Sequence, residues 1–230
     1  MEKNSSSLLK FSILAALLIA PATFYFMFVT SGMNYTSLNY YGPKDVEKTM
    51  VDGEEVIDTV YHSIPDFSFT DQNGNTVNGA SFDSKVYVAD FFFTSCQSIC
   101  PIMTSEMLRV QQHFEGVKEL AFLSHTVDPE TDSLEVLKAY QIDKNTDESN
   151  WHFVTGNKAE LYEIARRGYF VPVEDGDGGP EDFIHSPMLM LIDKEKHIRG
   201  FYDGTNSEQV DKLIEDIRKL LTDYVMSKKR

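Results

Sequence analysis

The side chains best able to do chemistry are the two cysteines of the chain, Cys96 and Cys100. A disulfide between residues so close in sequence closes too short a loop to stabilise a fold. At helical spacing their Cβ atoms would be about 5–6 Å apart, within reach of one soft metal ion or, with a small adjustment, of each other. Two thiolates suit Cu(I), and an added imidazole also allows Cu(II). Metal binding and thiol–disulfide exchange are therefore both candidates, and two inert buried thiols are the alternative.

The cysteines lie where a predicted strand gives way to a predicted helix. The apolar run 86–93 is typical of a strand covered on both faces of a sheet. After Pro101, which a first helical turn tolerates, apolar residues recur at helical spacing. At a helix N-terminus, unpaired amide groups and the helix dipole favour anions, so one or both thiols should have a lowered pKa.

The rest of the chain predicts an α/β domain from about residue 63 to residue 230. A hairpin over 66–77 turns at Asn73-Gly74 and precedes the core. Asp132 is expected to cap a short helix. The pattern predicts a mainly parallel central sheet with right-handed crossovers, to which a last hairpin adds antiparallel edges. Further strands are predicted at 120–127, 151–155, 188–193 and 197–202, and further helices at 158–168 and 210–224.

The N-terminal region predicts a single membrane span. Residues 11–29 carry no charge, and their number is close to the roughly 20 needed to cross a bilayer. Lys3 and Lys10 precede this run, so residues 1–10 should stay in the cytoplasm. A cleaved signal peptide is the alternative, but the apolar run is longer than its usual core. Residues 30–62 then form a tether with a short strand near 55–61, and the domain lies on the outer or periplasmic side of the inner (cytoplasmic) membrane.

The charge of the chain excludes one class of partner. The formal net charge is -15. The first thirty residues hold two lysines and one glutamate, so the excess of acidic residues lies in the rest of the chain. A domain this acidic is not expected to bind nucleic acid through a basic surface.

Four segments resemble one known family, in order along the chain. They read FFFTSCQSICPIM from Phe91, TVDPETD from Thr126, WHFVTG from Trp151, and DFIHSP from Asp182 followed by LID. Together they resemble the SCO (SCO1/SenC) family over residues 65–224. The resemblance implies a thioredoxin-like fold, in which two cysteines and a distant histidine bind one copper. It also implies a role in building the dinuclear copper centre of cytochrome c oxidase.

Carried onto this sequence, the copper ligands become Cys96, Cys100 and His185. Gln97 stands where many members have proline, which affects the stiffness of the loop and not a ligand. His185 directly precedes a predicted strand and follows a Gly-rich acidic loop, 174–182, that suits capture and release of a metal. Asp128, at the same sheet edge, is a candidate to orient His185 or tune the thiolates. His125 is the next candidate histidine.

Two functions remain open at this point. The first is a membrane-anchored copper metallochaperone, which holds Cu(I) or Cu(II) and delivers it to the copper-receiving subunit of cytochrome c oxidase. The second is a thiol–disulfide oxidoreductase that reduces the cysteines of that subunit through Cys96 and Cys100. Either would use a further partner, an upstream copper donor or a thiol reductant. A redox or copper sensor is a third alternative, and whether the protein is an enzyme stays open.

Overall fold

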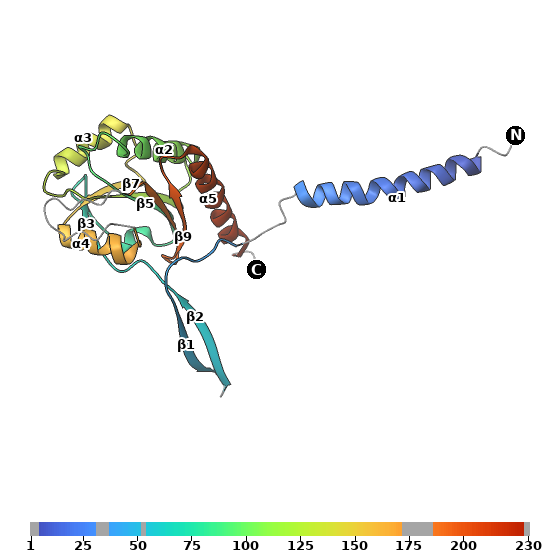
Figure 1. Cartoon of the computed structure of the whole chain (residues 1–230), viewed down its shortest axis with the longest axis horizontal. Helices are drawn as coiled ribbons and strands as arrows, with labels where there is room; N and C mark the ends of the chain where they lie inside the picture. The colour runs from blue at the N-terminus through green and yellow to red at the C-terminus, as the bar shows by residue number, and fades with distance from the viewer. Residues whose placement is uncertain (1–4, 31–36, 52–53, 172–185, 228–230) are drawn as a thin grey trace. The chain divides into compact units, whose positions relative to one another are not determined.

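The structure is a computed structural model that describes residues 5–30, 37–51, 54–171 and 186–227. It divides into two compact units, Met1–Ser37 and Leu38–Arg230. Figure 1 shows the helix of the first unit and the layered domain of the second.

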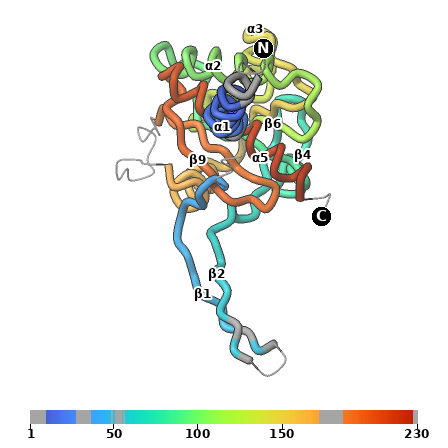
Figure 2. Tube along the Cα trace, turned by 90° about the vertical axis from the view of Figure 1, so that its right-hand side faces the viewer, coloured from blue at the N-terminus to red at the C-terminus, as the bar shows by residue number. Residues whose placement is uncertain are grey.

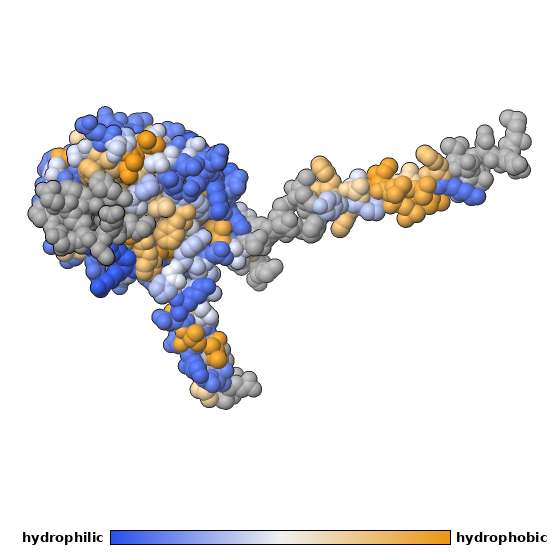
Figure 3. Space-filling view, viewed as in Figure 1, coloured by the Kyte–Doolittle hydropathy of each residue, from blue (hydrophilic) through white to orange (hydrophobic). Residues whose placement is uncertain are grey.

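The first unit is a helix, α1 (Ser5–Thr30), with Pro21 inside it. Its window Lys10–Met27 has a mean hydropathy of 1.6, and none of that window is buried. Most of its length is hydrophobic in Figure 3. By length and composition α1 is a candidate membrane span, although a signal sequence has the same properties.

The domain is built on a seven-stranded mixed sheet. The strand order is β4 (Thr76–Asn78), β3 (Ser68–Asp71), β7 (Trp151–Thr155), β6 (Leu120–Thr126), β5 (Val86–Phe92), β8 (Met188–Ile192), β9 (Ile198–Asp203). The predicted α/β fold is confirmed, and so are the antiparallel edges from the last hairpin, but the expected mainly parallel direction is partly wrong: among the described strands, only the pairs β5–β6 and β6–β7 are parallel. The hairpin β3–β4 adds antiparallel strands beside β7, and the hairpin β8–β9 adds them beside β5. Strands joined by a tight turn run antiparallel, which accounts for the pairs β3–β4 and β8–β9.

Helices cover both faces of this sheet (Figure 1). One face packs against α2 (Cys100–His113), α3 (Leu134–Lys144) and α5 (Ser207–Ser227), with Met103, Met107 and Trp151 fully buried between the layers. The other packs against α4 (Lys158–Glu163) and the π-helical turn that continues it to Gly168. Since β5 and β6 lie between two apolar layers, every one of their residues is buried, as their apolar runs predicted.

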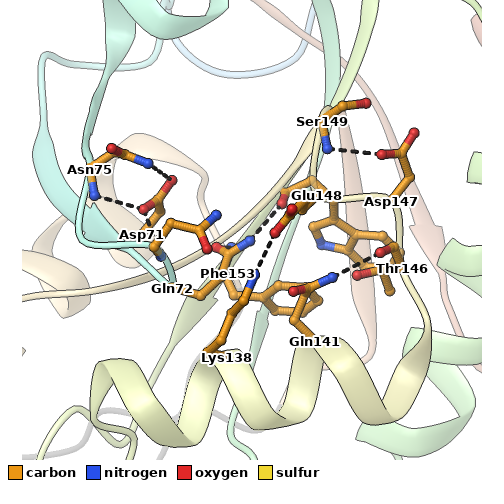
Figure 4. A network of polar contacts seen from close by, with 12 residues as sticks. Asp71, Gln72, Asn75, Lys138, Gln141, Thr146, Asp147, Glu148, Ser149 and Phe153 are labelled. Atoms are coloured by element: carbon orange, nitrogen blue, oxygen red, sulfur yellow. Dashed lines mark hydrogen bonds and ion pairs between the residues drawn. The ribbon is translucent and has the colours of Figure 1, made fainter.

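The side-chain amide of Gln72 continues the pairing of β3 with β7 beyond the end of β3. Gln72 donates to the carbonyl of Trp151 (3.1 Å) and accepts from the amide of Phe153 (2.8 Å), so it takes the place of a neighbouring strand. Asp71 accepts from the amides of Asn73 and Asn75 and closes the predicted turn. Figure 4 shows this network beside α3. Satisfied buried polar groups of this kind fix the register of the edge.

A second sheet precedes the domain core along the chain. β1 (Lys44–Val51) and β2 (Glu54–Tyr61) form an antiparallel ribbon of their own, seen in Figure 2. Residues 38–61, part of the range expected to be a tether, therefore belong to the same compact unit as the domain.

The segment before β1 is held against β9 by one buried side chain. Arg199 donates to the carbonyls of Leu38 (2.6 Å) and Asn39 (3.1 Å), and its guanidinium lies over the ring of Tyr40 at 4.1 Å. It also forms a buried ion pair with Asp193 at 2.8 Å. A single guanidinium with its fixed fork of donors thus joins the start of the domain to the β8–β9 turn.

Candidate metal centre

Cys96 and Cys100 lie between the end of β5 and the start of α2. The Cys96 amide donates to the carbonyl of Phe93 (3.2 Å), which closes the turn after the strand. Cys100 is the first residue of α2, and Pro101 follows it in the first turn, where its missing amide hydrogen costs nothing. Both thiols are free, and Cys96 and Cys100 are only 8% and 3% exposed.

The two thiols ionise differently. Burial raises the pKa of the Cys96 thiol, but hydrogen bonds from the side chain and backbone of Cys100 and from Ser98 outweigh it and lower this pKa to about 7. Burial, together with the hydrogen bond to Cys96, raises the pKa of the Cys100 thiol to about 12. The Cys96 Sγ lies 3.6 Å from the Ser98 Oγ. Cys96 is therefore the thiolate of the pair and Cys100 the proton donor.

A buried carboxylate fixes the turn that carries Cys96. Asp132 accepts hydrogen bonds from the backbone amide and the hydroxyl of Thr94, at the end of β5, and from the hydroxyl of Thr126, at the end of β6. Its side chain is fully buried. The prediction that Asp132 caps α3 is wrong: Ser133 is the N-cap and accepts from the amide of Val136. Asp132 instead joins two adjacent strand ends beneath the cysteine turn.

Asp128 lies in the loop that follows β6. Its amide donates to the Thr126 hydroxyl (3.0 Å), and its carbonyl accepts from the amides of Thr131 and Asp132. These backbone contacts form the turn that directs Asp132 toward Thr94. A role of the Asp128 carboxylate in the site stays a prediction.

A second buried carboxylate, Asp90, lies in the middle of β5. Burial raises its pKa to about 7, although a hydrogen bond with Ser124 acts in the opposite direction. Its charge contributes to the raised pKa of Cys100. Sequence reasoning missed Asp90 and assigned Asp132 a different role, that of a helix cap. The signal for Asp90 was present, since a carboxylate inside an otherwise apolar strand is rarely buried without a reason.

His185, the proposed third ligand, lies outside the described residues. Among the residues that the structure describes, no group of three histidine, cysteine or acidic side chains could hold a metal ion. His125 faces away from the cysteines: its ring stacks on Phe91 at 4.7 Å, in the core on the opposite face of the sheet. Burial lowers its pKa to about 3, so it is neutral.

The four other described histidines make contacts of their own away from the cysteines. His62 bonds the carbonyl of Gly168, His113 bonds Arg218, His152 bonds Asp71, and His197 bonds the carbonyl of His62.

A mixed sheet between two helical layers, with a dithiol where a parallel strand meets a helix, defines the class: a thioredoxin-like α/β domain with a site for soft metal or redox chemistry. The family follows from comparison with known sequences. A model of the SCO1/SenC family matches residues 58–222, and the chain belongs to this family.

Solved structures agree with this assignment. A SCO1/SenC family lipoprotein from Bacillus anthracis is 31% identical, with a TM-score of 0.63, covering 70% of this chain and 95% of that one. BsSco, described as a member of the Sco family of cytochrome c oxidase assembly proteins in which a disulfide switch was identified, is 28% identical with a TM-score of 0.60, covering 69% and 93%. Yeast Sco1 with copper bound shares the fold at 24% identity and a TM-score of 0.54, covering 68% and 89%.

Proposed function

We propose that this protein is a membrane-anchored copper metallochaperone that delivers copper to the dinuclear copper site of cytochrome c oxidase. The observation that carries the proposal is the pair of free, buried thiols that share a hydrogen bond at the start of α2. Two adjacent thiolates form a soft donor set that suits Cu(I) and can release it by ligand exchange. Family membership and the description of BsSco as an oxidase assembly protein support the choice of recipient.

His185 is proposed as the third ligand. The five described histidines all lie in other contacts, and two thiolates with one imidazole would also hold Cu(II). A disulfide between Cys96 and Cys100 would remove both thiolates, so only the reduced pair can take up the metal. With α1 as a single span, the domain would lie on the outer or periplasmic side of the membrane.

Copper titration of the full chain in detergent tests this ligand set. We expect one Cu(I) per chain in competition with a chromophoric chelator, and loss of binding in Cys96→Ser and Cys100→Ser. His185→Ala should weaken binding by about tenfold or more and remove nitrogen coupling from the Cu(II) electron paramagnetic resonance spectrum. His113→Ala is the matched control, because this exposed histidine contacts Arg218. Unchanged spectra in His185→Ala would rule out the proposed imidazole.

The unequal thiols also support a second function, reduction of a disulfide in the copper-receiving subunit. The Cys96 thiolate would attack the target disulfide, forming a mixed disulfide and releasing one target thiolate. Cys100, after losing its proton, would attack the Cys96 sulfur, release the second target thiolate and leave a Cys96–Cys100 disulfide. A thiol reductant must then restore the pair.

Oxidase assembly in the host separates the two functions. If the Cys96→Ser strain fails to assemble the copper centre only at low external copper, delivery is supported. Failure at every copper concentration, with normal assembly in His185→Ala, would favour reduction instead.

A further inference from the structure

The β1–β2 ribbon forms a two-stranded sheet of its own, and no described strand of the main sheet pairs with it. Figure 2 shows the ribbon standing out from the domain. The SCO1/SenC family model matches residues 58–222, so most of the ribbon lies outside the region that this model matches. A two-stranded ribbon is only marginally stable in water unless something covers one of its faces.

One face of the ribbon is apolar. In an antiparallel pair, alternate residues of one strand share a face with their partners in the other strand. This register places Val46, Met50 and Ile57 on the same face, where they are 64%, 71% and 63% exposed. Figure 3 shows hydrophobic residues on the ribbon. An exposed cluster of large apolar side chains is typical of a surface that meets an apolar phase or a partner.

The charges of the ribbon are divided between its two faces. Both of its lysines, Lys44 and Lys48, lie on the apolar face. The Lys44 Nζ lies 5.4 Å from the centre of the Tyr61 ring, and the Lys48 Nζ lies 2.7 Å from a carboxylate oxygen of Glu55. The described acidic side chains of the opposite face are Asp45, Glu47 and Asp58. The ribbon is therefore amphipathic, with one apolar face that carries all its cations and one acidic face.

The length of the chain limits how far the ribbon can lie from α1. The helix ends at Thr30, and Leu38 is held on the domain by the guanidinium of Arg199. The eight residues from one to the other span at most about 29 Å when fully extended. Each eight-residue strand of the ribbon is itself about 27 Å long. With α1 in a membrane, the surface of that membrane is within reach of the ribbon in every molecule.

We propose that the apolar face of the β1–β2 ribbon binds the surface of the membrane that α1 spans. Val46, Met50 and Ile57 contact the acyl region at the interface, and the acidic face points to water. Lys44 and Lys48 lie at the level of the phosphates, because their alkyl stems follow apolar surface while their charged ends reach the headgroups. The short tether and the division of charge select a bilayer over a soluble partner: the surface is always within reach, and its phosphates exclude the acidic face. This inference rests on the membrane anchor of the proposed function.

Binding through the ribbon leaves the cysteines accessible. The ribbon begins beside the β8–β9 turn, where the rings of Tyr61 and His197 lie 6.2 Å apart. This turn is at the opposite end of β5 from the cysteines, because Ile192 pairs with Tyr87 near the start of that strand. The cysteine end of the domain is therefore free to meet a partner while the ribbon lies on the bilayer.

Tryptophans placed on the two faces of the ribbon test the proposal. Full chains carrying Ile57→Trp on the apolar face, or Val60→Trp on the acidic face, are reconstituted in phosphatidylcholine nanodiscs with and without brominated acyl chains. We expect the added emission of Ile57→Trp to fall about twofold or more in brominated discs. Val60→Trp, at a 44% exposed position, is the matched control and should change little. The fully buried Trp151 gives a common background, and Leu17→Trp, within α1, reports insertion of the anchor and should be quenched.

A second variant separates contact from proximity. Val46→Asn with Met50→Asn in the Ile57→Trp chain should restore most of the emission, because less apolar area then holds this face on the bilayer. Equal quenching of Ile57→Trp and Val60→Trp would overturn the proposal. So would an unquenched Ile57→Trp beside a quenched Leu17→Trp, which leaves the anchor standing; a blue shift without quenching at Ile57→Trp would show that protein covers this face instead. An unquenched Leu17→Trp would overturn the anchor and this proposal with it.

Discussion

Cys96 and Cys100 are four residues apart, yet their surroundings favour opposite protonation states. Cys96 receives hydrogen bonds from Cys100 and Ser98, which stabilise its thiolate. Cys100 lies deeper, and the negative charges of Cys96 and Asp90 disfavour its ionisation. The position at a helix N-terminus alone would have lowered both pKa values. Burial decides which of the two is actually lowered.

Alkylation of the reduced wild-type protein should show this difference. Because the thiolate is the nucleophile, the rate at Cys96 should rise as the pH passes about 7 and level off above it. Cys100, with a pKa of about 12, should stay at least tenfold slower at pH 8. Peptide mapping after partial reaction with iodoacetamide measures the two rates separately. Equal pH midpoints for both cysteines would contradict the assignment.

Among the elements, the junction of β5 and β6 with the cysteine turn depends on Asp132. Parallel strands place their carboxyl ends at the same edge, and Phe92 and Thr126 are register partners there. Asp132 uses that proximity to bind Thr94 and Thr126 at once. The geometry of the Cys96 turn therefore depends on a residue 36 positions further along the chain.

Asp132→Asn should lower the free energy of unfolding of the domain by about 2–3 kcal/mol. The asparagine side chain keeps one acceptor oxygen, but its NH2 group would face the donor groups of Thr94 and Thr126. Ser133→Ala, which removes only the N-cap of α3, should cost about 1 kcal/mol. Urea unfolding of both variants measures the difference. Copper affinity should fall in Asp132→Asn and stay unchanged in Ser133→Ala. The reverse order of stabilities would contradict the role of Asp132, because the hydrogen bonds to Thr94 and Thr126 would then contribute less than the N-cap Ser133.

The elements also show how far sequence reasoning extends. Apolar runs predicted β5, β6 and β7 closely, because strands buried on both faces need such runs. Periodicity could not predict the directions in which β3 and β8 pair with β7 and β5, because it carries no information on which sheet edge a hairpin joins. Asp132 was misassigned because an acidic residue before a helix is the usual N-cap signal, and only the fold brings Thr94 near it. The ribbon β1–β2 was mostly missed because its exposed strands lack an apolar period.

In the molecule as a whole, the buried pair Asp193–Arg199 connects the start of the domain to its last hairpin. Arg199 is 7% exposed and Asp193 is 1% exposed, so water reaches neither charge and each is compensated by the other. Breaking a buried pair by removing one partner leaves an uncompensated charge and is strongly destabilising. The carbonyls of Leu38 and Asn39 would lose their donors at the same time.

Arg199→Met should therefore lower the free energy of unfolding by about 3–5 kcal/mol. Arg167→Met is the control: its ion pair with Glu163 is exposed, and its loss should cost under about 1 kcal/mol. Urea unfolding followed by near-ultraviolet circular dichroism measures both. Similar losses in the two variants would show that Arg199 contributes no more than a surface pair.

The unequal thiols have a consequence for proton balance under the proposed function. Copper replaces protons only on thiols that still carry them. Well above pH 7, Cys96 has already ionised, so loading the site would release about one proton, the one from Cys100. Well below pH 7 the two thiols would release about two protons. Through the thiols alone, copper affinity would then fall about tenfold per unit of acidification in the first range and about a hundredfold in the second, so the acidity of the compartment would set how tightly the copper is bound.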